Sequence, residues 1–532
     1  MKKNWHFLVL LAIIIIAIFV RTYNYHNWLY FEADQARNAK NSIEAIEEGV
    51  QKIPLLGPKA GGTDFHLGPI SYYFEYASGL IFGIDSPEVF AFSNLFFILL
   101  AIPLSYYFLN LFFVKEQSLL ITAIFASSYL ITQYSRFSWN PNSIIFWGLL
   151  FIVSVYKTVS DKNKKHIGWW LLLVSLSYGI VSQLHVMALL GFPLVALFFW
   201  FFYHPLNINW KFWAGAVLIF LVLYSPLIVY DVKTNGDNTR EFIKAFSVKS
   251  EKRSFFEKIG KTTEQYGKYY SLSIFSINEK ELKDVRWLGY LLISFSFGAS
   301  FVLVRRNKKE RNNVNSLPNE FFVLIGGWFL VFLLLNYKLA FEIDQPRFWF
   351  SSFFIPYILL AILIKSVWSN KIGKIISIFI CIFIVTINLS AVLNWYEGMK
   401  NQDEKNRFSR KISSTSLIQS DFIAYGKMEE SVDWIREESR SSKNVACFNS
   451  PSTYLASYKF IFDRNYPDFE AKRINKTIEM NLADNCDIFV IDHGNNSADE
   501  ITNRFFQKGV KISLKKGYQT GLITIWKASF EK

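Results

Sequence analysis

The segment Tyr30-Phe-Glu-Ala-Asp-Gln-Ala-Arg-Asn-Ala-Lys40 brings two carboxylates and a guanidinium close together. Glu32, Asp34 and Arg37 follow the first long apolar run directly, so we expect them at a membrane surface. A carboxylate at the edge of the hydrocarbon can act as a general base. If Glu32 partners Asp34, the pair of like charges raises the pKa of one of them. We therefore predict Asp34 and Glu32 as catalytic residues, although spacing alone also fits Asp34 as a simple helix-capping acid.

A short helix must hold these side chains. Apolar residues recur at helical spacing between residues 33 and 49, which predicts a surface helix that begins near Asp34 and ends at Gly49. Asp34 and Arg37 then stand at i and i+3, on neighbouring positions of one face. The predicted apolar stripe consists of Ala36, Ala39, Ile43 and Ile46.

Further candidate binding residues lie beside other apolar runs. His66, in the Gly-rich stretch Gly61-Gly-Thr-Asp-Phe-His-Leu-Gly-Pro-Ile70, could bind phosphate or orient Asp34. Cations fixed at headgroup level could hold a phosphate, but each could equally be an ordinary headgroup anchor. Arg136 and Asn140 are costly between two spans unless they line a wet cavity. The predicted substrate- or phosphate-binding residues are Arg37, His66, Arg136, Asn140, His185, Asp231, Lys233, Arg240 and Arg347.

The elements around these residues are membrane spans. The chain has 532 residues, of which 52% are hydrophobic, and the apolar residues form long runs. The net charge of +14 sits largely in short loops, which indicates topology and not a nucleic-acid partner. We predict a polytopic α-helical membrane protein with about eleven transmembrane helices. They are 5–21, 88–111, 117–134, 142–158, 167–183, 187–203, 211–228, 286–304, 319–337, 347–367 and 372–393.

The orientation depends on residues 68–84, which are short, rich in Tyr and interrupted by Glu75. We predict that they lie along the membrane surface, because the connection that follows, Asp85-Ser-Pro-Glu88, is acidic and makes a poor cytoplasmic loop. Lys and Arg then concentrate in the loops on one side, whereas the opposite short loops hold Arg136 and Lys338. This bias predicts a cytoplasmic N-terminus, an uncleaved first span, and the segments 22–87, 229–285 and 394–532 outside the cell.

The tail 394–532 has a different character from the transmembrane domain 1–393. Buried strands around 445–448 and 487–492, helices at 429–440 and 498–508, and a closing hairpin over 512–527 predict a small extracytoplasmic α/β domain. Cys447 and Cys486 lie in this domain, where a disulfide and two buried thiols are both open.

Several of these stretches, in this order, resemble the membrane-embedded GT-C glycosyltransferases. The resemblance is strongest to bacterial members of glycosyltransferase family 39, the group related to protein O-mannosyltransferases and lipid A aminoarabinose transferases. It covers about residues 1–390 and leaves the tail unassigned. The stretches are Asp34-Gln-Ala-Arg37, Leu55-Leu-Gly-Pro58, His66-Leu-Gly-Pro-Ile-Ser-Tyr-Tyr73, Ser135-Arg-Phe-Ser-Trp-Asn-Pro-Asn142, Gln183-Leu-His185 and Tyr230-Asp-Val-Lys-Thr234.

The resemblance implies a reaction on the outer face of a bacterial cytoplasmic membrane. A sugar would pass, with inversion, from a polyprenyl-phosphate donor to an acceptor that is a protein, a lipid or a cell-surface glycan. Asp34 maps to the family's base. Relatives often carry Arg-His two residues after the acid equivalent to Asp231. Here Lys233-Thr234 stands instead, so a single donor replaces a bidentate one.

Metal use differs across this superfamily, and the sequence offers no tight His/Cys/Asp cluster. We predict no cofactor and no metal, with a divalent cation as the open alternative. A flippase or transporter of lipid-linked sugars is the second functional hypothesis, and a surface anchor whose working part is the tail is the third. The transporter needs no external base. Charges at the ends of spans, together with the lack of an internal repeat, favour the enzyme.

Overall fold

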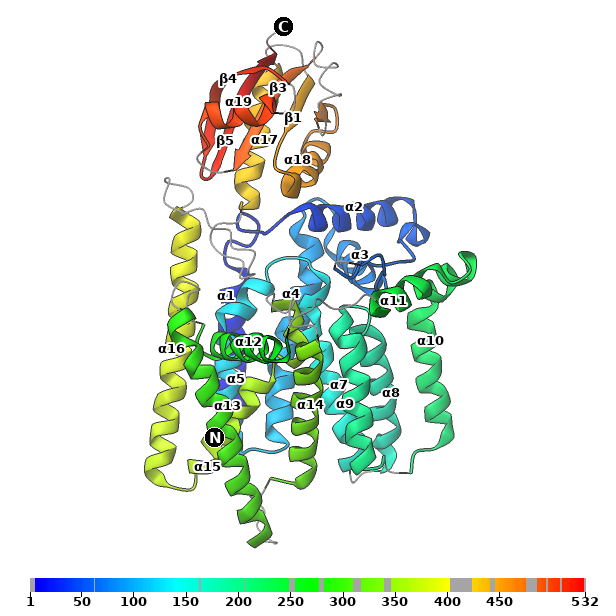
Figure 1. Cartoon of the computed structure of the whole chain (residues 1–532), viewed down its shortest axis with the longest axis vertical. Helices are drawn as coiled ribbons and strands as arrows, with labels where there is room; N and C mark the ends of the chain where they lie inside the picture. Colours follow the sequence, from blue (N-terminus) through cyan, green and yellow to red (C-terminus); the bar gives the residue numbers. More distant parts are fainter. Residues whose placement is uncertain are drawn as a thin grey trace.

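The computed structural model describes residues 5–61, 63–161, 164–205, 207–247, 254–276, 282–309, 317–338, 346–401, 423–440, 445–474, 486–493, 496–507 and 510–530. These residues form a long helical bundle with a small α/β domain at one end (Figure 1). We call this end of the bundle the domain end. The first residues of α1 (Trp5–Thr22) lie toward the opposite end, as the predicted topology requires.

Within the described residues, eight helical segments are long and apolar enough to cross a membrane. The prediction of a polytopic helical membrane protein is therefore confirmed. The segments belong to α1, α4 (Glu88–Asn110), η2 with α7 (Asn140–Ser143 and Ile144–Ser160), α10 (Trp210–Lys233), α13 (Leu282–Lys309), α14 (Asn319–Lys338), η4 with α15 (Phe350–Ser352 and Ile355–Val367) and α16 (Lys371–Asn401).

The other three predicted spans are also helical but do not meet the same length criterion. α8 (Lys164–Val181) and α9 (Val186–Phe202) are apolar helices with shorter qualifying stretches. The run 117–134 is divided at Ser128, whose non-helical backbone (ψ 122°) separates α5 (Lys115–Ser127) from α6 (Tyr129–Tyr134). Periodicity cannot reveal such a break, because the apolar pattern continues through it.

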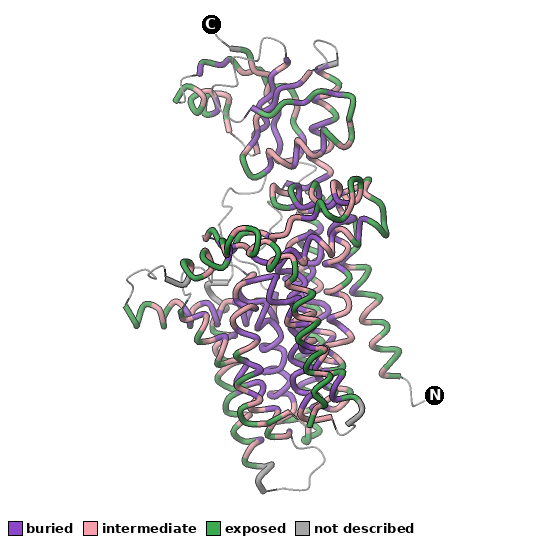
Figure 2. Tube along the Cα trace, turned by 90° about the vertical axis from the view of Figure 1, so that its right-hand side faces the viewer, coloured by how far each residue is buried: buried purple, intermediate pink, exposed green. Residues whose placement is uncertain are grey.

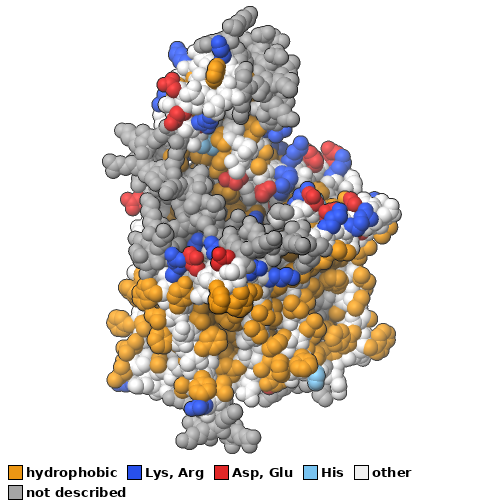
Figure 3. Space-filling model, viewed as in Figure 1, with side chains coloured by type: hydrophobic (Ala, Val, Ile, Leu, Met, Phe, Trp, Pro, Cys, Tyr) orange, Lys and Arg blue, Asp and Glu red, His pale blue; other side chains and the backbone are white. Residues whose placement is uncertain are grey.

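The surface of the bundle is apolar, as expected where lipid replaces water. Hydrophobic side chains cover much of the lower half of the face seen in Figure 3, and charged side chains gather above them toward the domain end. Figure 2 shows that the buried residues concentrate along the interior of the bundle. Examples of exposed hydrophobic side chains on the bundle surface are Leu218 and Val222 on α10, and Phe379 and Phe383 on α16.

Short helices cover the domain end. α2 (Ala33–Glu48) ends where predicted, at Gly49, which has a φ of 108° and donates its N–H to Ala45. α3 (Ile70–Phe82) has 13 residues, too few to span a bilayer, and packs between α2 and α4. The connection 229–285 contains α11 (Asp237–Ser247) and α12 (Phe255–Phe275), which hydropathy did not reveal.

The C-terminal domain is a five-stranded sheet in the order β2-β1-β3-β5-β4. β1 (Val445–Asn449) pairs in parallel with β2 (Glu470–Arg473) and β3 (Asp487–His493). β5 (Ile523–Phe530) is antiparallel to both β3 and β4 (Ile512–Thr520), which confirms the closing hairpin. The helices among its described residues are α17 (Tyr425–Arg440), α18 (Ser452–Asn465) and α19 (Ala498–Phe506). Of these elements, α18 and β2 were not predicted from the sequence.

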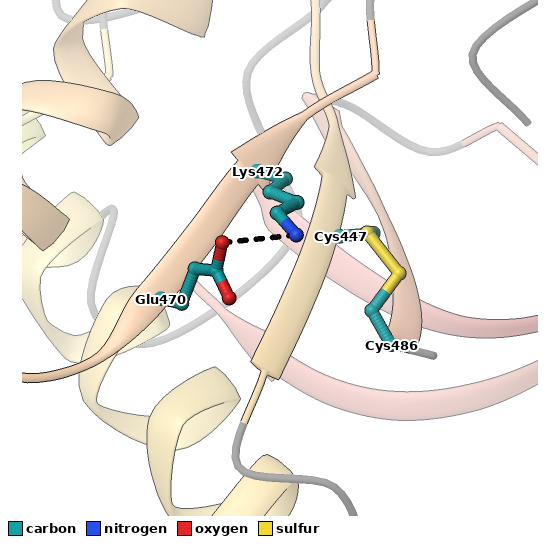
Figure 4. The surroundings of a disulfide bond; sticks show 4 residues. All are labelled: Cys447, Glu470, Lys472 and Cys486. Carbon is teal, nitrogen blue, oxygen red and sulfur yellow. Dashed lines mark ion pairs between the residues drawn. A yellow bond between two sulfur atoms is a disulfide. The ribbon is translucent and has the colours of Figure 1, made fainter. Parts of the chain in front are cut away.

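Cys447 and Cys486 form a disulfide, which decides between the two alternatives left open by the sequence. Figure 4 shows the bond beside β1, with the Glu470–Lys472 ion pair of β2 on the other side of that strand. The bridge ties β1 to the residue that precedes β3.

The C-terminal domain is docked directly on the segment after α1. Tyr425 and Gly426 donate their N–H groups to Leu29 and Asn27, each at 3.1 Å. Phe31 packs its ring against Tyr425 and against Phe460 of α18. Residues of both parts share one hydrophobic core, so the domain holds the start of α2 in place.

Candidate functional site

Asp34 stands in the first turn of α2 with its carboxylate open to solvent. Its side chain is 59% exposed, and Arg37 Nη1 donates to Asp34 Oδ1 at 2.8 Å. Arg37 also donates from Nη2 to Asn38 Oδ1 at 3.0 Å. The structure thus confirms the predicted pairing at i and i+3, and it leaves an oriented acid that a substrate hydroxyl can reach.

Behind this pair lies a carboxylate that was not among the residues predicted from the sequence. Glu75 of α3 is buried, with 1% of its surface exposed. It accepts hydrogen bonds from Asn38 Nδ2 at 3.2 Å, from Ser42 Oγ at 3.5 Å and from Ser138 Oγ. Burial raises the pKa of Glu75 to about 7, although these bonds favour its ionised form. The sequence signal that could have identified Glu75 is the presence of an acidic residue within an apolar, Tyr-rich segment.

Glu32 faces the C-terminal domain. Its backbone N–H donates to Gln35 Oε1 at 3.1 Å, at the N-terminus of α2. The hydroxyls of Tyr30 and of Tyr454, on α18, hydrogen-bond its carboxylate. Burial raises the pKa of Glu32, and the nearby charge of Asp34 adds to the rise, as expected for neighbouring acids. No local pattern could have found Tyr454, because its partner lies in a distant part of the chain.

The loop 135–142, between α6 and α7, connects this region to a second group of predicted residues. Ser138 accepts a bond from Gln35 Nε2 on its carbonyl, at 2.9 Å, and donates its hydroxyl to Glu75. The ring centroid of the next residue, Trp139, lies 5.7 Å from the guanidinium carbon of Arg347. Glu75 and Arg347 therefore contact adjacent residues of one loop, Ser138 and Trp139.

Arg347, His185 and Asn140 come together in this second group. Asn140 Nδ2 donates to the carbonyl of Leu184 at 2.6 Å, and the ring of His185 packs on Phe348. Burial, helped by the charge of Arg347, lowers the pKa of His185 to about 3, so this imidazole is neutral. Its Nδ1 accepts the N–H of Met187 at the start of α9.

The Gly-rich loop closes over Arg347. A Cβ atom on Gly61 would stand 3.1 Å from Arg347 Nη2, so glycine leaves the guanidinium its space. His66, in the same loop, contacts Gly57 O through Nδ1 at 2.8 Å and does not touch Asp34. Asn238 accepts the N–H of His66 and donates its own N–H to Asp231 Oδ1, at 2.8 and 2.9 Å. Asp231 thereby holds the start of α11 against this loop.

The other predicted phosphate-binding cations have hydrogen-bond partners of their own or are exposed. Arg136 is buried and donates from Nη1 and Nη2 to the carbonyls of Arg21 and Asn24, at 2.7 and 3.1 Å, which caps the end of α1. Arg240 bonds the Asn235 carbonyl and Asp237. Lys233 is exposed at the end of α10. Arg136 and Arg240 thus bond backbone carbonyls near the ends of helices, as cations in such positions often do.

No protein-family model matches the chain, and no curated protein matches it. Several solved structures, however, match the chain. The oligosaccharyltransferase of Archaeoglobus fulgidus, in complex with Zn and sulfate, aligns at a TM-score of 0.50 with 11% identity, over 94% of this chain and 69% of that one. ArnT from Cupriavidus metallidurans aligns at 0.45 over 99% and 98%, with 11% identity in the apo state and 10% when bound to undecaprenyl phosphate.

The chain therefore shares its fold with the archaeal oligosaccharyltransferase. At these identities the likeness establishes architecture, and function has to be argued from the site.

Proposed function

We propose that the protein is a glycosyltransferase that moves a sugar from a polyprenyl-phosphate donor to an acceptor hydroxyl, with inversion at the anomeric carbon. The observation that carries this proposal is the exposed carboxylate of Asp34, oriented by Arg37 at the domain end of the bundle. The GT-C fold supports the reaction class. The resemblance of residues 34–37 to the family's base motif supports the choice of residue.

In the proposed reaction, Asp34 takes the proton of the acceptor hydroxyl. The acceptor oxygen attacks the anomeric carbon while the bond from that carbon to the phosphate oxygen breaks, and the lipid phosphate leaves with the electron pair. Negative charge grows on the phosphate, where a nearby cation stabilises the transition state. Arg347 is the best candidate, because its guanidinium lies beside the rings of Trp139 and Phe348, and Trp139 directly follows Ser138, which donates a hydrogen bond to Glu75.

Glu32 remains a candidate for a catalytic role, and its contacts suggest how the C-terminal domain takes part. Tyr454 reaches from that domain to the carboxylate two residues before Asp34. An acceptor that approaches Asp34 would therefore also meet the domain. We propose that the acceptor is a protein, a lipid or a cell-surface glycan on the outer face of a bacterial cytoplasmic membrane. The disulfide supports that location, since such bonds persist in oxidising compartments.

No metal or cofactor is part of the proposed reaction, with a divalent cation as the alternative. Among the described residues, no group of three His, Cys, Asp or Glu side chains could hold a metal ion. The carboxylate of Asp34, oriented by Arg37, can remove a proton without one.

The first test is Asp34→Asn, which keeps the shape of the side chain but removes the base. Membranes that carry the variant should transfer a labelled sugar from a polyprenyl phosphate at least about 100-fold more slowly than wild type, as expected for loss of a general base. Glu48→Gln is the matched control, because Glu48 is an exposed acid of the same helix, paired with Lys52. Full transfer by Asp34→Asn would exclude Asp34 as the base.

A further inference from the structure

Glu75 is built into the site as an acceptor of hydrogen bonds. Its two carboxylate oxygens face Asn38 Nδ2, Ser42 Oγ and Ser138 Oγ, and each of these groups donates to it. Asn94 Nδ2 in turn lies 3.5 Å from Ser138 Oγ. Three donors around a buried carboxyl suit its ionised form, because a protonated carboxyl would bring a fourth hydrogen into the same space.

A line of hydrogen bonds runs from this buried acid to the exposed one. The amide of Asn38 donates from Nδ2 to Glu75 and accepts Arg37 Nη2 on Oδ1. Arg37 then donates from Nη1 to Asp34. The orientation of one amide therefore connects the two carboxylates. With Glu75 ionised, the nitrogen of Asn38 must face Glu75, and its oxygen is left for Arg37.

We propose that Glu75 is a positioning residue that fixes Asp34 through Asn38 and Arg37, and that it does so only while it is ionised. This inference rests on the proposed role of Asp34 as the base. When Glu75 takes up a proton, its O–H can donate to Asn38 Oδ1, and the amide turns. Arg37 then loses Asn38 Oδ1 as an acceptor, keeps its contact with Tyr72, and holds Asp34 less firmly in one orientation.

The surroundings of Glu75 allow both forms. The titratable groups that interact with it are Arg37 on α2 and Tyr72 on α3. Burial raises the pKa of Tyr72, which therefore stays neutral near pH 7. α4 and the loop 135–142 contribute Asn94 and Ser138, which do not titrate. Since the pKa of Glu75 is about 7, its charge changes between about pH 6 and pH 8.

The first experiment needs no activity. Carboxyls of the purified full-length protein are labelled with a carbodiimide and an amine between pH 8 and pH 6, and labelling of Asp34 is divided by labelling of Glu48. The ratio corrects for the reagent's own pH dependence, because Glu48 is an exposed acid on the same helix. We expect the ratio to rise several-fold in wild type as Arg37 is released. In Glu75→Gln and Asn38→Ala it should be high and independent of pH.

The second experiment measures transfer. With a pKa of about 7, the ionised fraction of Glu75 falls about tenfold from pH 8 to pH 6, and wild-type transfer should fall with it. Glu75→Gln should be slower at pH 8 and should lose this part of the pH profile. Glu48→Gln should keep the wild-type profile.

The outcomes separate the inference from the proposed function. A labelling ratio that is flat in wild type, or a Glu75→Gln variant that keeps the wild-type pH dependence, would overturn the positioning role of Glu75. If labelling responds as expected but Asp34→Asn transfers at the wild-type rate, Glu75 does control the Arg37–Asp34 pair and the proposed base is wrong. Because Gln fills the same space as Glu, a merely structural role would leave both readouts unchanged.

Discussion

Arg347 is the residue on which the proposed binding of the donor phosphate depends. A charge-assisted hydrogen bond contributes about 1.5–3 kcal/mol, so Arg347→Gln should raise the KM for the polyprenyl-phosphate sugar about 10- to 100-fold. Steady-state kinetics with varied donor checks this. Arg504→Gln, which removes an arginine paired with Asp492 in the C-terminal domain, should leave the KM unchanged. An equal effect of both variants would show a general loss of stability instead.

At this scale the sequence reveals local pairs and misses assembled ones. The pairing of Asp34 with Arg37 was predictable because a spacing of three positions on a helix brings two side chains together. Glu75 was not, because its donors come from α2 and from Ser138, in segments that only the fold brings together. Arg136 was assigned to phosphate, but its donors are used on backbone carbonyls, and no sequence pattern shows which carbonyls a side chain will meet.

At the scale of elements, His26 links three segments. Its Nδ1 lies 3.0 Å from Glu88 at the start of α4, and its Nε2 lies 2.8 Å from Glu429 on α17. Hydrogen bonds to Glu429 and Glu88 raise the pKa of His26 to about 10. Because the folded pKa lies above the usual 6.5, the stability gained is complete below about pH 6.5. It is lost as the pH rises through about 10.

His26→Gln should therefore lower the thermal midpoint of the C-terminal domain at pH 7, and the difference from wild type should shrink as the pH approaches 10 or above. Thermal unfolding followed at several pH values measures it. A difference that stays constant between pH 7 and pH 10.5 would show that the charged imidazole is not what links the segments.

Helices with a clear period were predicted well, including α2 and its end at Gly49. The split between α5 and α6 was missed because the apolar pattern runs across Ser128. α12 was missed for the opposite reason. It carries polar and aromatic residues whose burial depends on neighbouring helices, so hydropathy alone gave only a polar connection.

At the scale of the whole molecule, the disulfide should stabilise one part only. Cys447 and Cys486 are separated by 39 residues, and closing a loop of this size in the unfolded chain stabilises the folded domain by about 4 kcal/mol. Replacing both by Ser should lower the thermal midpoint of the C-terminal domain and leave unfolding of the bundle unchanged. Wild type under reducing conditions should behave like the variant. If neither change moves the midpoint, the bridge does not support the domain.

The overall plan of the protein was predictable because lipid imposes it. Long apolar runs must be helices, and the change in composition after residue 393 marks a separate part. How the two parts fit together was not predictable, because the docking contacts join residues about 400 positions apart, such as Tyr30 with Ala424. That docking brings Tyr454 to Glu32, and so it shapes the site itself.

The most direct test of a transferase is the fate of the donor lipid. Purified protein in lipid nanodiscs is given a polyprenyl-phosphate sugar labelled in both parts, together with an extract that contains acceptors. We predict that free polyprenyl phosphate and glycosylated product appear in equal amounts with wild type and not with Asp34→Asn. A donor that remains intact with wild type, while proteoliposomes move it from one leaflet to the other, would contradict transfer and identify a lipid-sugar transporter.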